Sequence, residues 1–295
     1  MAQCLERILF ASQAVSRQRA QPGKTARGII LTLGAALLLV SCGAPAQSSN
    51  LLPQQAESAS APPTSVTPGP PPATSPTIVF KNVQQMTGWQ TCGACGNTGG
   101  GGALAQFSLT RGITTPSLSG SSSEFAIGGG GSPAYTNGYW YIAHPGVNQQ
   151  VATLIYSFDI LVPAGDENTP QAIEFECQQR INGRVYNFAW QAEYPSNRWR
   201  IFDYTLRRWD DSGIALQRFS PDTWHHIVAE YHTEGTTVVH DAISIDGARH
   251  VAGKRHSAMA SSNTSPQFTN AFQLDLNSRA TPYRVYVDNM TVEIW

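Results

Sequence analysis

The chain has 295 residues, of which 19 are basic and 20 acidic, so its formal net charge is -1. Only 13% of the residues are charged, about half the usual share in globular proteins, and the body of the chain has no dense block of Lys and Arg. This argues against a nucleic-acid partner, because affinity for nucleic acid comes mostly from neutralising phosphates. The 26 glycines and 19 prolines instead predict many short strands joined by turns.

The first 41 residues have the pattern of an export signal. Basic residues precede an apolar run over 28–40, and the run ends in the sequence LVSCG at 39–43. This gives a basic region, an apolar region and a cleavage site of small residues. The run of 13 residues is too short to cross a hydrocarbon core of about 30 Å as a helix. We therefore predict that residues 1–41 are a signal peptide that is removed.

The LVSC ending of this segment resembles the lipobox of bacterial lipoproteins. In that family the cysteine is diacylated through its sulfur and becomes the new amino terminus, which implies a lipid on Cys42 and a bilayer as partner. Acyl chains hold a soluble domain at a membrane because each buried CH₂ contributes about 0.8 kcal/mol. By resemblance to the sorting rules of these lipoproteins, the residue after Cys42 decides retention, and Gly43 in place of an aspartate implies passage to the outer membrane. The alternative is an ordinary secreted protein cut near Ser41.

Residues 42–76 are predicted to be a disordered tether. They are rich in Pro, Ala, Ser, Thr and Gln and contain almost no large apolar side chain, so they cannot bury enough surface to offset the entropy of ordering. Such a segment acts as a partly extended spacer. Without residues 1–41 the chain keeps 14 basic and 19 acidic residues, a net charge of -5. The mature protein is therefore acidic.

The remaining cysteines fit an exported protein. Cys92 and Cys95 form a C-x-x-C pair just before a glycine run, which leaves three interpretations: a redox pair, half of a zinc site or a local disulfide. A structural zinc needs four ligands and no second pair exists, while a thioredoxin-type pair begins a helix. We predict a short disulfide, with free thiols as the alternative. Cys177 alternates with Ile173 and Phe175 and is predicted to be buried.

Residues 77–295 are predicted to form one all-β domain. Turn signals such as Asn137-Gly138, Asn182-Gly183 and Asp246-Gly247 separate short β-rich runs, and no segment has helical periodicity over three turns. This pattern predicts a two-sheet antiparallel β-sandwich, or jelly roll. The expected strands cover 78–83, 104–110, 124–127, 139–143, 152–162, 172–178, 184–194, 199–203, 224–232, 237–246, 271–276 and 283–294.

Alternation of polar and apolar residues assigns faces to these strands. In 172–178, the apolar residues occupy one face, while Glu174, Glu176 and Gln178 project from the other. Two other strands, at 184–194 and 224–232, are divided in the same way. The polar row of 184–194 is Asn187, Gln191 and Glu193, and that of 224–232 is His226, Glu230 and His232. Each layer of the sandwich is therefore expected to have one polar face open to water.

Several segments carry a resemblance to a known fold. The sequence WHHIVAEY at 224–231, followed by AISIDG at 242–247, looks like the late hairpin of concanavalin A-like lectin/glucanase jelly rolls, including laminin-G-type modules. The closing YVDNMTV at 286–292 is similar to their last strand. The resemblance covers most of 78–295 and implies a sheet that holds a glycan, with aromatic rings on sugar faces and carboxylates or amides on hydroxyls. The ligand-binding candidates that it implies are Glu174, Glu176, Asn187, Gln191, Glu230 and Trp140, with Tyr139, Tyr141 and Trp209 as further stacking platforms.

Two neighbouring carboxylates raise the question of hydrolysis. Retaining glycosidases hold two carboxyl groups about 5–5.5 Å apart, and Glu174 and Glu176 are expected about 6–7 Å apart at Cα, from two strand steps of about 3.3 Å. Glucanases of the resembled fold, however, carry Glu-x-Asp-x-x-Glu, and residues 174–179 lack the Asp and the final Glu. Lyases of that fold use an Arg/Gln/His/Tyr set, and no motif here supports the match.

These observations favour a non-catalytic, lipid-anchored surface module that binds polysaccharide. The alternative is a carbohydrate-active enzyme, either a polysaccharide lyase or a glycoside hydrolase, that uses Glu174 and Glu176 with Glu230. In that case His226 would be the acid/base partner of Glu230. A further alternative is a structural envelope protein without a ligand.

No cofactor is predicted from the motifs. The histidines follow no metal-ligand spacing, and neither a nucleophile elbow nor a phosphate or dinucleotide loop is present. Calcium stays open as an alternative, because it needs several converging oxygen ligands. The candidates for such ligands are Asp166, Glu167 and Asn168, or Asp210 and Asp211.

Overall fold

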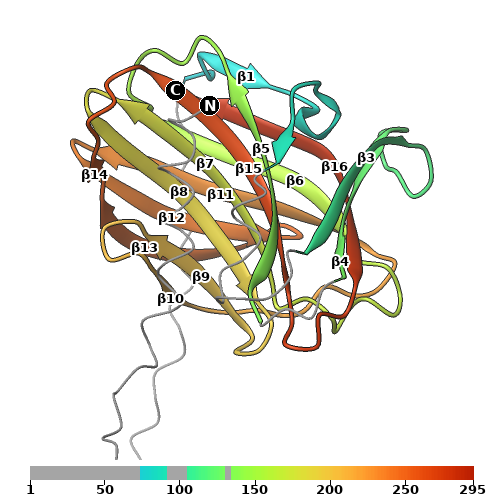
Figure 1. Ribbon diagram of the computed structural model, residues 1–295. Coiled ribbons are helices and arrows are strands. Elements are labelled where there is room, and N and C mark those ends of the chain that lie inside the picture. Colours follow the sequence, from blue (N-terminus) through green and yellow to red (C-terminus); the bar gives the residue numbers. More distant parts are fainter. Residues whose placement is uncertain (1–73, 92–104, 130–133) are drawn as a thin grey trace, which may run out of the picture. The chain divides into compact units, whose positions relative to one another are not determined.

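The computed structural model describes residues 74–91, 105–129 and 134–295. Two eight-stranded antiparallel sheets make up this part of the chain and pack face to face (Figure 1). The all-β sandwich predicted from the turn signals and alternation is therefore confirmed. Among the described residues, no helix is long and apolar enough to cross a membrane.

The two sheets are named sheet I and sheet II. The strands of sheet I follow the order β13 (Ala248–Ser257), β12 (Thr237–Ile245), β11 (Trp224–Glu234), β6 (Thr153–Leu161), β16 (Tyr283–Ile294), β4 (Ser122–Gly128) and β3 (Gln106–Ile113). In addition, β1 (Ile78–Phe80) pairs with β16. The strands of sheet II follow the order β10 (Arg208–Ala215), β9 (Arg198–Asp203), β8 (Arg184–Glu193), β7 (Ala172–Ile181), β15 (Gln267–Leu276), β5 (Thr136–His144) and β2 (Gln90–Thr91). In addition, β14 (Met259–Ala260) pairs with β8.

The amino-terminal edge differs from the predicted strand over 78–83. Only β1 (Ile78–Phe80) is extended, and the chain then turns through a short 3-10 segment, η2 (Val83–Gln85). Val83 and Gln84 are buried in this turn. The side chain of Gln84 donates to Asp288 of β16, at 3.3 Å. The polar contact of Gln84 with β16 thus fixes a turn where apolar content alone predicted a longer strand.

Side chains that alternate along the central strands fill the space between the sheets. On β7, Ile173, Phe175 and Cys177 are buried, as predicted, and Cys177 is a free thiol. The ring of Phe175 meets that of Phe158 on β6 across the sandwich, with centroids 4.9 Å apart. Such packed aromatic contacts bury large areas and dominate the energetics of a core. Trp190 of β8 is also fully buried, as predicted.

Gly138 does not form the turn predicted for Asn137-Gly138. Both residues lie inside β5, where a Cβ on Gly138 would lie 2.8 Å from Cβ of Phe107. The glycine therefore allows β3 to approach β5 closely. Trp140, two residues later, is completely buried and packs edge-on against Phe107 and Phe125, with centroids 5.3 and 5.1 Å away. The prediction that Trp140 is a stacking platform is wrong for this reason.

Two other turn predictions are confirmed by backbone geometry. Asn182 and Gly183 have φ of 50° and 68° between β7 and β8, and Asp246 and Gly247 have φ of 51° and 82° between β12 and β13. Two consecutive residues with positive φ match the type I′ hairpin turn, which favours Asn-Gly and Asp-Gly. The first of these turns sets the register of β7 against β8, on which the site below depends.

Candidate ligand-binding hollow

The outer face of sheet II carries an open hollow near its centre. Five strands contribute to it, namely β5, β7, β8, β10 and β15. Register explains the space, because Glu176 of β7 lies between Ala189 of β8 and Ala271 of β15. Two alanines flanking a longer side chain leave a depression in the sheet surface. The hollow is lined by Tyr139, Glu174, Phe175, Glu176, Ala189, Trp209, Ala271, Phe272 and Gln273.

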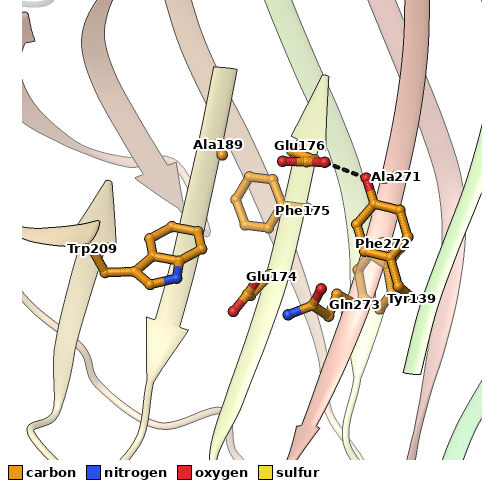
Figure 2. A pocket seen from close by; sticks show the side chains of 9 residues that line it. All are labelled: Tyr139, Glu174, Phe175, Glu176, Ala189, Trp209, Ala271, Phe272 and Gln273. Carbon is orange, nitrogen blue, oxygen red and sulfur yellow. Dashed lines mark hydrogen bonds between the residues drawn. The ribbon is translucent and has the colours of Figure 1, made fainter. Parts of the chain in front are cut away.

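Polar and aromatic side chains point into this hollow. Figure 2 shows the indole of Trp209 on one side and the phenol of Tyr139 on the other, with the carboxyl groups of Glu174 and Glu176 between them. Trp209 is half-buried, and its ring lies 5.1 Å from that of Phe202. The indole thus packs beside the ring of its cross-strand neighbour and stays partly exposed.

Glu176 is held by two donors. The hydroxyl of Tyr139 donates to its Oε1, and Nδ2 of Asn187 donates to its Oε2 at 3.0 Å. Burial raises the pKa of Glu176, while these two hydrogen bonds oppose the rise. Burial and the Glu176 carboxylate raise the pKa of Tyr139 well above its usual value, so the phenol keeps its proton and stays a donor.

Glu174 lies beside a second carboxyl group, that of Asp275 on β15. Nε2 of Gln191 donates to Oε1 of Glu174 at 2.5 Å, and Nε2 of Gln273 donates to Oδ1 of Asp275 at 2.9 Å. Burial, and then the charge of Asp275, raise the pKa of Glu174 well above its usual value. Burial also raises the pKa of Asp275 to about 7, against hydrogen bonds from Glu174 and Gln273 that lower it. Two buried carboxyl groups this close tend to share one proton.

Asp275 and Gln273 were not among the predicted site residues. The alternation that marked the polar face of 172–178 also holds in β15, where Ala271, Gln273 and Asp275 share the outer face of sheet II. Applying the same two-residue alternation to residues 271–275 of the sequence would have identified Gln273 and Asp275. The structure therefore adds a carboxyl and an amide group to the predicted set.

Four of the predicted ligand-binding residues do come together here. Glu174 and Glu176 lie on β7, and Asn187 and Gln191 lie on the adjacent β8. In register, Gln191 is opposite Glu174 and Asn187 is opposite Gln178. The prediction of one shared polar face over these two strands agrees with the strand pairing.

Glu230 and His226 lie elsewhere, on the outer face of sheet I. Their neighbours on β11, Ile227 and Ala229, are buried in the core, so the two polar side chains face away from sheet II. Glu230 accepts hydrogen bonds from Arg249, the shortest at 2.8 Å, and Nδ1 of His226 lies 2.8 Å from Asp159. The predicted grouping of Glu230 and His226 with the β7 carboxylates is wrong, because alternation along a strand does not reveal in which sheet the strand lies.

Two of the predicted calcium ligands, Asp210 and Asp211, do not converge. Asp210 and Asp211 point to opposite sides of β10, since Asp211 faces Arg198 at 3.8 Å and Asp210 faces β9 and β13. In the loop before β7, Asp166 accepts the backbone N–H of Arg284, and Glu167 accepts that of Gly165.

The lipidation residue and the predicted disulfide lie outside the described part of the chain. These are Cys42, and Cys92 with Cys95.

Comparison with known proteins gives no family for this chain. No family model matches it, and no curated protein matches it. Among solved structures, an endo-β-1,4-glucuronan lyase from Trichoderma reesei is 14% identical, with 72% of this chain and 94% of that chain covered and a TM-score of 0.44.

Two further solved structures have lower scores. A family 11 carbohydrate-binding module from Clostridium thermocellum, in complex with a β-1,3-1,4-mixed-linked tetrasaccharide, is 12% identical over 73% of this chain and 94% of that chain, with a TM-score of 0.34. The alginate lyase vAL-1 from Chlorella virus is 8% identical over 66% and 91%, with a TM-score of 0.37. Likenesses at this level do not assign the chain to a family.

Proposed function

We propose that this protein is a non-catalytic module that binds polysaccharide in the hollow of sheet II. The observation that carries the proposal is the placement of Trp209 and Tyr139 on either side of Glu174 and Glu176. Sugars offer apolar ring faces and many hydroxyl groups. Ligand sites combine aromatic walls with a few fixed polar groups, and hydrogen bonds to carboxylates are stronger than neutral ones.

The charge of the hollow favours a neutral glycan over a polyanionic one. Glu174, Glu176 and Asp275 are all acidic, and carboxylates of a polyuronate would be repelled by any of them that is ionised. Arg200, on the same face of sheet II, is already engaged with Glu193 at 3.0 Å. We therefore infer a neutral polysaccharide as the class of ligand.

Affinity electrophoresis of the full chain tests this proposal. Mixed-linkage β-glucan, xylan and alginate serve as probes, and we expect retardation by a neutral polysaccharide. Trp209→Ala removes a stacking platform and Glu176→Gln removes a charged acceptor, so each is expected to weaken binding about tenfold or more, equivalent to about 1.4 kcal/mol. Glu230→Gln is the matched control on sheet I and should bind like the parent.

Two results would contradict the proposal. One is a parent protein that no neutral polysaccharide retards, which would favour a structural envelope protein. The other is normal binding by both Trp209→Ala and Glu176→Gln, which would place the ligand on another surface.

The second candidate function is hydrolysis or lyase activity in the same hollow. One observation favours it: burial and the charge of Asp275 raise the pKa of Glu174 well above its usual value, while Glu176, two residues along on the same face, accepts two hydrogen bonds that oppose the rise of its own pKa. Neighbouring carboxyl groups whose surroundings separate their pKa values are the parts of an acid and base pair. The same polysaccharides are incubated with the protein and assayed for reducing ends and unsaturated products. Turnover that Glu174→Gln abolishes would replace the non-catalytic proposal.

Attachment to the cell envelope through Cys42 is also part of the proposal. It is supported by the lipobox-like sequence and the Pro-rich spacer. We expect Cys42→Ser to move the protein from the outer-membrane fraction to the soluble fraction and to abolish palmitate labelling, because the thioether to lipid cannot form. Cys4→Ser, within the predicted signal, is the control and should be labelled normally. A Cys42→Ser variant that still partitions with membranes contradicts the anchor.

A further inference from the structure

A cluster of metal-ligating side chains lies where the edges of the two sheets approach each other, apart from the hollow. Asp203 ends β9 and Asp210 lies on β10, both in sheet II, while His256 lies on β13 of sheet I. One carboxylate oxygen from each aspartate and one ring nitrogen of the histidine all lie within 4.8 Å of one another. Three potential ligands from two sheets therefore converge on one point.

The carboxylate of Asp203 is fixed so that one oxygen faces this point. Its Oδ1 accepts the backbone N–H groups of Thr205 and Leu206, both at 2.9 Å. Its Oδ2 is thereby turned toward Nδ1 of His256, 3.2 Å away. The side chain of Asp203 is only 12% exposed, so the oxygen is oriented before any ligand arrives.

The histidine of the cluster is buried with an unsatisfied nitrogen. The His256 side chain is 9% exposed, and its Nε2 has no hydrogen-bond partner. Its ring stands nearly perpendicular to that of His240, with centroids 5.6 Å apart. Nδ1 of His256 is the nitrogen that faces Asp203, while Nε2 lies on the other side of the ring.

We propose that Asp203, Asp210 and His256 bind a divalent transition-metal cation of the Zn²⁺ type. Imidazole nitrogen and carboxylate oxygen are ligands that zinc takes, whereas calcium uses oxygen ligands and does not require a histidine. Three protein ligands leave a coordination position for water. The cation would replace the present contact of Nδ1 with Asp203 by two metal–ligand bonds.

The guanidinium group of Arg208 competes with the metal ion for Asp210. Nε of Arg208 donates to Oδ1 of Asp210 at 2.7 Å. The Arg208 side chain is 61% exposed, so it can turn into solvent and release this oxygen. An exposed ion pair of this kind contributes little to stability, so zinc binding can offset its loss.

Because the ligands come from both sheets, the cation would also cross-link the edge of the sandwich. A ligand that binds the native state but not the unfolded chain stabilises the fold by mass action. We therefore expect added ZnCl₂ to raise the midpoint of thermal unfolding of the full chain, and CaCl₂ at the same concentration to leave it unchanged.

Calorimetric titration of the chelator-treated full chain with ZnCl₂ tests the site directly. The parent should bind, and Asp210→Asn and His256→Gln should each weaken this binding at least tenfold and abolish the thermal shift. Asp210→Asn changes a partly exposed residue, so it tests the site even if His256→Gln folds poorly. The matched controls are Asp211→Asn, on the opposite side of β10, and His232→Gln, a carboxylate-flanked histidine on sheet I. Both should bind like the parent.

Cobalt absorption separates this site from the cysteines. Co²⁺ bound to Asp203, Asp210 and His256 should show d–d bands without thiolate-to-metal charge transfer, and these bands should be lost in Asp210→Asn. No binding by the parent, or affinity unchanged in both Asp210→Asn and His256→Gln, would overturn the proposal. A thiolate charge-transfer band that persists in Asp210→Asn would do so as well.

Discussion

Asparagine in place of Asp275 is expected to raise the free energy of unfolding by about 2–4 kcal/mol at pH 8. Asp275 is 2% exposed and lies beside Glu174 on the outer face of sheet II. Burial raises its pKa to about 7, so the folded protein must ionise a buried carboxyl group at pH 8. Asparagine carries no charge, keeps an acceptor for Nε2 of Gln273, and offers an N–H to Glu174.

The sign of this effect follows from proton binding. Between about pH 4 and pH 7 the unfolded chain has lost the proton of Asp275 while the folded protein still holds it, so stability falls as pH rises through this window. Above pH 7 the loss is complete, and below about pH 4 both states are protonated. We therefore expect the advantage of Asp275→Asn to be greatest at pH 8 and to vanish near pH 4.

Urea unfolding of the parent and of Asp275→Asn from pH 4 to pH 8 checks this prediction. Asp211→Asn, an exposed residue near Arg198, is the control and should change stability by less than about 0.5 kcal/mol at every pH. Equal stability of Asp275→Asn and parent at pH 8 would show that Asp275 carries no buried charge. A stabilising substitution beside the hollow would also mean that the acidic residue is kept at a cost to the fold, which is common at functional sites.

Alanine in place of Asp288 is expected to destabilise the protein by about 3–5 kcal/mol. Asp288 of β16 is fully buried. Its carboxylate accepts six hydrogen bonds, which come from Gln84, Ser117, Leu118, Ser119 and Asn289, with Ser119 donating twice. The substitution would leave all these donors without their acceptor, and it would release the loop before β4 and η2 together from β16.

The contribution of Asp288 also depends on pH. Burial alone would raise the pKa of this carboxyl group, but the hydrogen bonds from Ser119, Ser117 and Leu118 outweigh burial and lower it. The stabilisation is therefore present above the pKa of an unfolded aspartate, near 3.9, and is lost as pH falls through the lowered folded value. Denaturant unfolding should show a large deficit for Asp288→Ala at pH 7 that shrinks toward pH 3. Asp211→Ala is the control, and a deficit below about 1 kcal/mol at pH 7 would contradict this account.

Most strands were predictable because alternation and turn chemistry are local signals. The strands at 172–178, 184–194 and 283–294 have clear apolar rows, and the structure contains them as β7, β8 and β16. Four strands were missed: the two-residue strands β2 and β14, and the longer β10 and β13, which lie at the edges of the two sheets. An edge strand buries few side chains, and β13, with the sequence ARHVAGKRHS, is mostly exposed or half-buried. It therefore lacks the apolar row that marked the others.

The candidate site was predictable only within neighbouring strands. Glu174, Glu176 and Gln191 were found because β7 and β8 form a hairpin with a recognisable turn. Asp275 is about 100 residues further along the chain, and its place beside Glu174 follows from the pairing of β15 with β7. Glu230 was assigned to the wrong face because strand order depends on such distant pairings. Local sequence thus determines which side of a strand is polar, but the topology decides which polar rows meet.

Successive side chains along β7, β8 and β15 point to opposite faces of sheet II, so the residues of these strands form two sets. One set fills the core and the other carries the polar groups of the hollow, and Phe175 and Phe272 are core residues that also border the hollow. A substitution in the second set can alter the shape or charge of the surface while the first set still specifies the fold. The same sandwich can therefore be adapted to new ligands by single replacements, at little risk to its folding.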